Sequence, residues 1–109
     1  MISKQRWKKY HVSDEIRKIL EHRDKKCVYC NISFGSGGAK DSVEHIENET
    51  WKKNPAVLGD LAICCLACNG SKGTYNLLEW FEKPYCKNKK INKETVSPAI
   101  KEWIKINCK

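Results

Sequence analysis

The sequence lacks any long apolar segment. Its longest apolar run, residues 61–68, is far too short to cross a membrane, and no apolar signal segment follows Met1. We therefore expect a cytoplasmic protein with no membrane partner. The 109-residue chain also has no internal repeat and no low-complexity linker, so the sequence predicts one small domain with a modest core.

Acidic residues are also scarce. The chain has 13 Asp and Glu against 21 Lys and Arg, which gives a formal net charge of +8. This positive charge favours a polyanionic partner, most simply nucleic acid, although lysine also serves solubility. It gives no support to a protein-interaction domain.

The cysteines do not form the even set that a secreted disulfide scaffold would need, because there are seven of them. Four lie in two C-x-x-C pairs, Cys27/Cys30 and Cys65/Cys68, a spacing typical of one tetrahedral zinc. A four-cysteine ligand set is complete, so the zinc would be structural. The neighbouring Cys64 leaves a shifted ligand set open. We expect the three remaining cysteines to be buried apolar side chains: Cys64, Cys86 and Cys108.

Capping residues and hydrophobic periodicity predict several helices and two short strands. Ser13 is a helix N-cap followed by acidic residues, and Ser97-Pro98 has the N-cap and N1 residues of a last helix. Alternation of apolar and polar residues predicts the strands. The expected elements are helices over about 14–25, from residue 68 or 69 to near Gly73, after Asn76 and from Pro98, and strands over 42–46 and 61–64.

Basic residues gather in two segments. The first is an N-terminal arm, residues 1–12, in which aromatic residues alternate with cations; the second is the lysine-dense stretch 83–93. Both segments can bind a nucleic-acid backbone. The alternative for the N-terminal arm is a solvated tail with Trp7 and Tyr10 docked on the core, and the alternative for residues 83–93 is a solvated surface patch. The candidate nucleic-acid contacts are Arg6, Lys8, Lys9, Lys87, Lys89 and Lys90.

Residues suited to phosphodiester hydrolysis lie between and beside the cysteine pairs. His45 is a candidate general base, because neutral imidazole accepts a proton near neutral pH. Glu44 and Asn69 offer oxygen ligands for a hard ion such as Mg²⁺ or Mn²⁺, and other divalent ions fit the same ligands. Lys72, one turn after Asn69, is a further candidate phosphate contact. Because adjacent strand residues point to opposite faces, Glu44 and His45 can share a site only at a bend or strand end.

The order C-x-x-C, Glu-His, C-x-x-C-Asn-x-x-Lys-Gly over residues 14–82 resembles the zinc-containing HNH endonucleases. That resemblance implies an α+β, zinc-stabilised ββα-metal domain with flanking N- and C-terminal helices. It implies a nuclease domain over 13–109, with its core at 27–82 and a helical extension at 83–109. It implies that His45 is the general base, that Glu44 and Asn69 bind the catalytic ion, and that Asp60 holds the histidine loop. The chain departs from the family pattern at Glu44, usually Asp, and at Asp60, usually Asn.

The expected function is therefore a metal-dependent endonuclease acting on DNA, with double-stranded DNA as the expected partner. The alternative is a zinc-ribbon module that binds nucleic acid without cutting it, the two departures having disabled catalysis. One active site cuts one strand, so double-strand cleavage would require a homodimer or two successive events. No groove-reading element is identifiable, and the sequence does not separate roles in defence, mobile elements and phage packaging.

Overall fold

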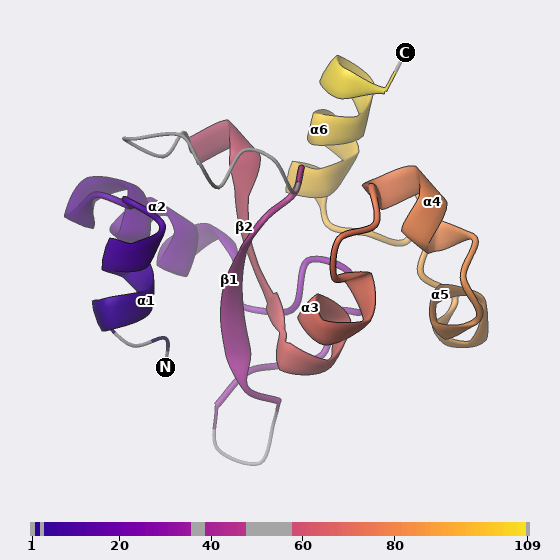
Figure 1. The fold of residues 1–109 in the computed structure, drawn as a ribbon, viewed down its shortest axis with the longest axis horizontal. Coiled ribbons are helices and arrows are strands. Elements are labelled where there is room, and N and C mark those ends of the chain that lie inside the picture. Colours follow the sequence, from indigo (N-terminus) through magenta and orange to yellow (C-terminus); the bar gives the residue numbers. More distant parts are fainter. Residues whose placement is uncertain (1, 3, 36–38, 48–57, 109) are drawn as a thin grey trace.

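A two-stranded antiparallel sheet lies at the centre of the computed structural model, which describes residues 2, 4–35, 39–47 and 58–108 (Figure 1). Strand β1, Asp41–His45, pairs with β2, Leu61–Cys65, so that Asp41 faces Cys65 and His45 faces Leu61. Strand β2 leads directly into helix α3, Leu66–Lys72. The α+β class predicted from the sequence is confirmed.

Helices occupy both sides of this sheet (Figure 1). On the N-terminal side, α1 and α2 pack against one face, while α3 and the C-terminal helices lie on the other. A short 3-10 turn immediately precedes β2. The bounds are α1 Lys4–Lys9, α2 Asp14–Arg23, η2 Leu58–Asp60, α4 Leu77–Phe81, α5 Pro84–Lys89 and α6 Pro98–Asn107. Among the described residues, no helix combines the length and apolar character needed to cross a membrane.

The strand alternation sorts side chains into two hydrophobic clusters. Val43 of β1 packs with Trp7 of α1 and Leu20 of α2 on one face. Ala62 and Cys64 of β2 belong to a second cluster, which includes residues of α4, α5 and α6. Because helices cover both faces, all residues of β2 are buried. The sheet is thus an internal layer, and side chains from its two faces reach different surroundings.

The N-terminal arm is docked on the core, which is one of the two alternatives left open by the sequence. It forms the six-residue helix α1, whose Trp7 is buried, while Arg6, Lys8 and Lys9 stay exposed. Burying one large indole anchors a helix that is too short to be stable alone. Residues 4–12 therefore carry a folded basic surface next to the sheet.

Helix α2 begins at the predicted Ser13 cap, whose hydroxyl accepts a hydrogen bond from the Ile16 N–H. It ends at Arg23, two residues before the expected end. The buried Asp24 carboxylate accepts a hydrogen bond from the Ile63 N–H of β2 at 2.9 Å and also contacts the Arg23 guanidinium. Tertiary contacts to β2 thus replace another helical turn and fix α2 to the sheet.

Helix α3 starts earlier than the sequence pattern predicts, at Leu66. The Cys65 sulfur takes the N-cap place, because it accepts a hydrogen bond from the Cys68 N–H at 3.4 Å. The helix ends at Lys72, and Gly73 follows with a φ of 49°, close to the expected interruption. Helix α5, within the lysine-dense segment, was not expected. The sequence also predicts a flexible turn over 34–40 and an irregular loop over 47–60, and the central parts of both, residues 36–38 and 48–57, lie outside the described residues.

Candidate metal centre and catalytic site

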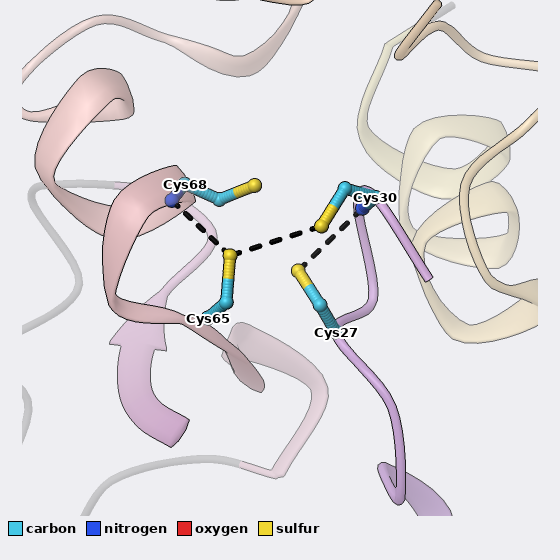
Figure 2. A group of neighbouring side chains, drawn as sticks. All are labelled: Cys27, Cys30, Cys65 and Cys68. Atoms are coloured by element: carbon cyan, nitrogen blue, oxygen red, sulfur yellow. Dashed lines mark hydrogen bonds between the residues drawn. The ribbon is translucent and has the colours of Figure 1, made fainter. Parts of the chain in front are cut away.

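The four predicted zinc ligands come together in one cluster (Figure 2). Cys27 and Cys30 follow α2, whereas Cys65 and Cys68 lie at the start of α3, and their four sulfurs lie within 4.8 Å of one another. A tetrahedral site with Zn–S bonds of about 2.3 Å has sulfurs about 3.8 Å apart. The Cys30 and Cys65 sulfurs are 3.7 Å apart, so the cluster fits a structural metal such as zinc. The shifted set with Cys64 is not the one assembled.

Each cysteine pair carries the same backbone hydrogen bond. The Cys30 N–H donates to the Cys27 sulfur at 3.5 Å, and the Cys68 N–H donates to the Cys65 sulfur at 3.4 Å (Figure 2). Such donors offset the negative charge of thiolates and orient them toward a metal. The local turns are therefore already arranged for thiolate ligands.

The sulfurs also influence one another's protonation. The pKa of Cys27 is lowered to about 5, chiefly because Cys68 hydrogen-bonds to it. Conversely, the pKa of Cys68 is raised by that contact and by burial, and burial raises the pKa of Cys30 to about 11. One thiolate is thus stable in the cluster without metal, whereas ionising all of them requires a cation to balance their charge.

Helix α5 contributes a contact that sequence reasoning missed. The Tyr85 hydroxyl lies 3.3 Å from the Cys68 sulfur, and its ring stacks on Trp80 with centroids 6.0 Å apart. The cysteine spacing gives no hint of this contact, because Tyr85 belongs to the extension after the motif.

Glu44 lies on the face of β1 that looks toward α3, and it is almost fully buried. One carboxylate oxygen accepts a hydrogen bond of 2.6 Å from the Tyr29 hydroxyl, and the other lies 3.6 Å from the Lys72 Nζ. The side chains of Glu44 and Lys72 are only 5% and 2% exposed. Burial raises the pKa of Glu44 to about 7, although Lys72 and Tyr29 both act to lower it.

Lys72 is therefore placed differently from the phosphate contact predicted for it. Its ammonium is buried beside Glu44, because a carboxylate in the interior needs a nearby positive charge. Lys72 lies one turn after Asn69 in α3, as the sequence predicts. Its side chain contacts Glu44 because α3 packs against β1.

The predicted divalent-ion ligands, Glu44 and Asn69, both make contacts within the protein. Both oxygens of Glu44 already have partners, and Asn69 donates a 2.8 Å hydrogen bond from its Nδ2 to the Ser42 hydroxyl. Across the described part of the chain, the four cysteines are the only cluster of three or more His, Cys, Asp or Glu side chains able to hold one ion. The Lys72 ammonium lies beside Glu44, the residue for which the sequence predicts a bound Mg²⁺ or Mn²⁺.

His45 is the last residue of β1 and faces the N-terminal helices, opposite to Glu44. Its ring packs edge-on against Tyr10, with centroids 4.8 Å apart and an angle of 89°. His45 is 7% exposed, and its Nε2 is buried without a hydrogen-bond partner among the described residues. Burial lowers the pKa of His45, a shift that the charge of nearby Asp60 opposes and that of Lys72 reinforces. The imidazole is therefore neutral at pH 7.

Asp60 lies where the chain returns to β2. Its backbone carbonyl accepts a hydrogen bond from the Ile46 N–H at 2.8 Å, which joins the two ends of the segment between the strands. This contact holds the residue after His45 close to Asp60. The expected role in holding the histidine loop thus has a backbone contribution that does not depend on the Asp60 side chain.

The predicted surface cations lie in two separate places. Those of α1 shortly precede Tyr10, which packs against His45, and those of α5 lie near the cysteine cluster. Lys87 pairs with Glu82 at 2.9 Å, and the Lys89 Nζ lies 5.3 Å from the centre of the Tyr85 ring. Lys87, Lys89 and Lys90 are all exposed.

A scan of protein-family models and searches of curated proteins and of solved structures find no match to this chain. The resemblance to HNH endonucleases therefore rests on the residues of the motif.

Proposed function

We propose that this protein is an endonuclease of the HNH type that hydrolyses DNA phosphodiester bonds with His45 as general base. The observation that carries the proposal is the state of His45: a neutral, buried imidazole at the end of β1 with an unpartnered Nε2. Buried polar atoms nearly always have partners, so an exception is a candidate for a group that acts on a substrate or water. The cysteine pairs and the β1–β2–α3 order provide the surrounding context.

The chemistry assigned to His45 requires a free lone pair at Nε2. A neutral imidazole can take a proton from water as the water oxygen attacks phosphorus; the P–O bond to the departing sugar oxygen then breaks, and that oxygen takes a proton from solvent. The lowered pKa of His45 keeps the imidazole neutral at neutral pH. Nε2 is buried and Tyr10 packs edge-on against the ring, so water and phosphate can reach Nε2 only after neighbouring side chains move. Because Tyr10 directly follows the basic helix α1, DNA bound to Arg6, Lys8 and Lys9 would lie close to the residue that packs against His45.

A catalytic Mg²⁺ or Mn²⁺ stays part of the proposal as a requirement to be tested. An ion at Glu44 would be repelled by the nearby Lys72 ammonium, so we assign no step of the reaction to the ion. The Glu44–Lys72 pair is also the specific observation that favours the second candidate function. A chain whose metal-binding acid is neutralised by its own lysine would act as a zinc-stabilised module that binds nucleic acid without cutting it.

One experiment separates the two candidates. Zinc-loaded protein is incubated with supercoiled plasmid in Mg²⁺, in Mn²⁺ and in buffer without either ion, beside His45→Ala and the control His22→Ala. His22 is an exposed residue of α2, so its removal tests for a general effect of losing an imidazole.

The endonuclease proposal predicts nicking by the wild type and by His22→Ala, and its loss in His45→Ala. Gel-shift measurements on the same plasmid should show that all three proteins still bind DNA. Binding without nicking by the wild type under every metal condition would reject the enzyme and leave the binding module.

A further inference from the structure

The hydroxyl of Tyr85 lies outside the cysteine motif yet touches one of its sulfurs. The distance from the Tyr85 oxygen to the Cys68 Sγ is 3.3 Å, within hydrogen-bond range for sulfur. In a zinc-loaded cluster Cys68 is a thiolate and has no proton to give. A tyrosine hydroxyl keeps its proton at neutral pH, so Tyr85 is then the donor.

The ring of Tyr85 is held in place by contacts independent of the sulfur. It stacks on Trp80 at an interplanar angle of 24°, and Trp80 is itself fully buried and donates its indole N–H to the Ser71 hydroxyl at 3.0 Å. Pro84 at the first position of α5 fixes the start of the helix that carries the tyrosine. The hydroxyl is therefore positioned before any metal binds.

Backbone N–H groups of their own turns donate to the Cys27 and Cys65 sulfurs, whereas the Cys68 sulfur contacts the side chain of a distant helix. We propose that Tyr85 is a positioning residue of the metal centre, whose hydroxyl donates to the Cys68 thiolate and thereby strengthens zinc binding. This inference concerns the cysteine cluster and does not depend on nuclease activity.

The physical basis is charge. Four thiolates and one Zn²⁺ carry a net charge of −2, and a hydrogen bond to a thiolate offsets part of it. Loss of such an outer contact typically weakens metal binding by about 10- to 100-fold. The contact also ties α5 to the metal centre, so the C-terminal extension contributes directly to the zinc affinity of the motif.

The test removes one oxygen. Tyr85→Phe retains the ring that stacks on Trp80 and faces Lys89, and loses only the donor. Tyr75→Phe is the matched control, because the Tyr75 ring also has a lysine over it, the Lys83 Nζ at 4.5 Å, and lies outside the cluster. Zinc affinity is measured by competition with a chromophoric chelator, and the sulfur-to-metal charge-transfer band is recorded after loading with Co²⁺.

We expect Tyr85→Phe to bind zinc about 10- to 100-fold more weakly, with the Co²⁺ charge-transfer band moved to lower energy, because an unbonded thiolate gives up electrons more easily. Tyr75→Phe should match the wild type. Zinc affinity within about twofold of the wild type in Tyr85→Phe, or an equal loss in Tyr75→Phe, would overturn the assignment.

A second variant tests the donor in the opposite direction. Site-specific replacement of Tyr85 by 3-fluorotyrosine keeps the hydroxyl and makes it a stronger donor. The Co²⁺ band should then move to higher energy, opposite to its shift in Tyr85→Phe. A residue that only fills space would not produce shifts of opposite sign, so an unchanged band in the fluorinated protein would also refute the proposal.

Discussion

Replacing Lys72 with methionine tests whether the buried Glu44–Lys72 pair holds α3 against the sheet. Methionine keeps most of the length of the lysine stem and removes the ammonium that lies 3.6 Å from the Glu44 carboxylate. Two unit charges at that distance attract by about 4–5 kcal/mol at an effective dielectric constant near 20. Removing one member of a buried pair typically costs about 3–5 kcal/mol, because the other charge is left without a partner.

The cost should depend on pH, because Glu44 can become neutral. Its pKa of about 7 lies above the ordinary 4.5, so the folded state holds a proton that the unfolded state releases, and stability falls as pH rises through this window. Without Lys72, the strongest influence that lowers this pKa is gone, and the window extends above pH 7. The deficit of Lys72→Met should therefore be small at pH 6 and grow toward pH 8.5, by at most about 1.4 kcal/mol per pH unit.

Urea unfolding followed by tryptophan fluorescence, with zinc in excess, gives the free energy of unfolding at each pH. Lys101→Met, at an exposed lysine of α6, is the matched control and should change stability by less than about 0.5 kcal/mol. The double variant Lys72→Met/Glu44→Gln removes both charges and keeps an acceptor for Tyr29, so it should recover to within about 1 kcal/mol of the wild type. A deficit in Lys72→Met that is below about 1 kcal/mol at pH 8.5, or that shrinks as pH rises, would refute this account of the pair.

Two further predictions concern zinc and His45. Removal of zinc by a chelator should unfold the chain, because structural zinc contributes on the order of 10 kcal/mol, comparable with the stability of a typical domain. Metal analysis should show about one zinc per chain in the wild type and in Cys86→Ala. The zinc should be lost in Cys65→Ala. Nicking should require neutral His45, whose lowered pKa predicts a rate that falls only below about pH 6.5 as the imidazole gains a proton. Initial rates at constant zinc content between pH 5 and 8 check this, and a midpoint above 6.5 would contradict it.

Features set by neighbouring residues were predictable from the sequence. The C-x-x-C spacing identified the cysteines that the structure brings together, and the caps at Ser13, Asn76 and Ser97 each accept the expected hydrogen bond from a backbone N–H. These signals depend on geometry within four residues, which tertiary packing rarely changes. The boundary of α3 differed because a cysteine sulfur served as its cap, a role that propensity does not assign to cysteine.

Features set by distant contacts were not predictable. Strand alternation required Glu44 and His45 to face opposite ways, but the sequence did not show that α3 covers one face and α1 the other. This arrangement of helices places Lys72 beside Glu44 and Tyr10 against His45. Tyr85 belongs to α5, a helix that the lysine-rich sequence did not suggest, so its contact with Cys68 had no signal.

The two candidate functions make competing demands on one carboxylate. A divalent ion bound at Glu44 would lie close to the Lys72 ammonium, and the two positive charges would repel each other, so ion binding competes with the Glu44–Lys72 pair. A doubly charged ion attracts a carboxylate more strongly than an ammonium does, but it must also shed water and displace a lysine that is almost fully buried. The strength of the Glu44–Lys72 pair therefore works against catalysis that uses an ion at Glu44. A pair that contributes several kcal/mol at pH 8.5 favours the binding module, and a weak pair that an ion can open favours the endonuclease.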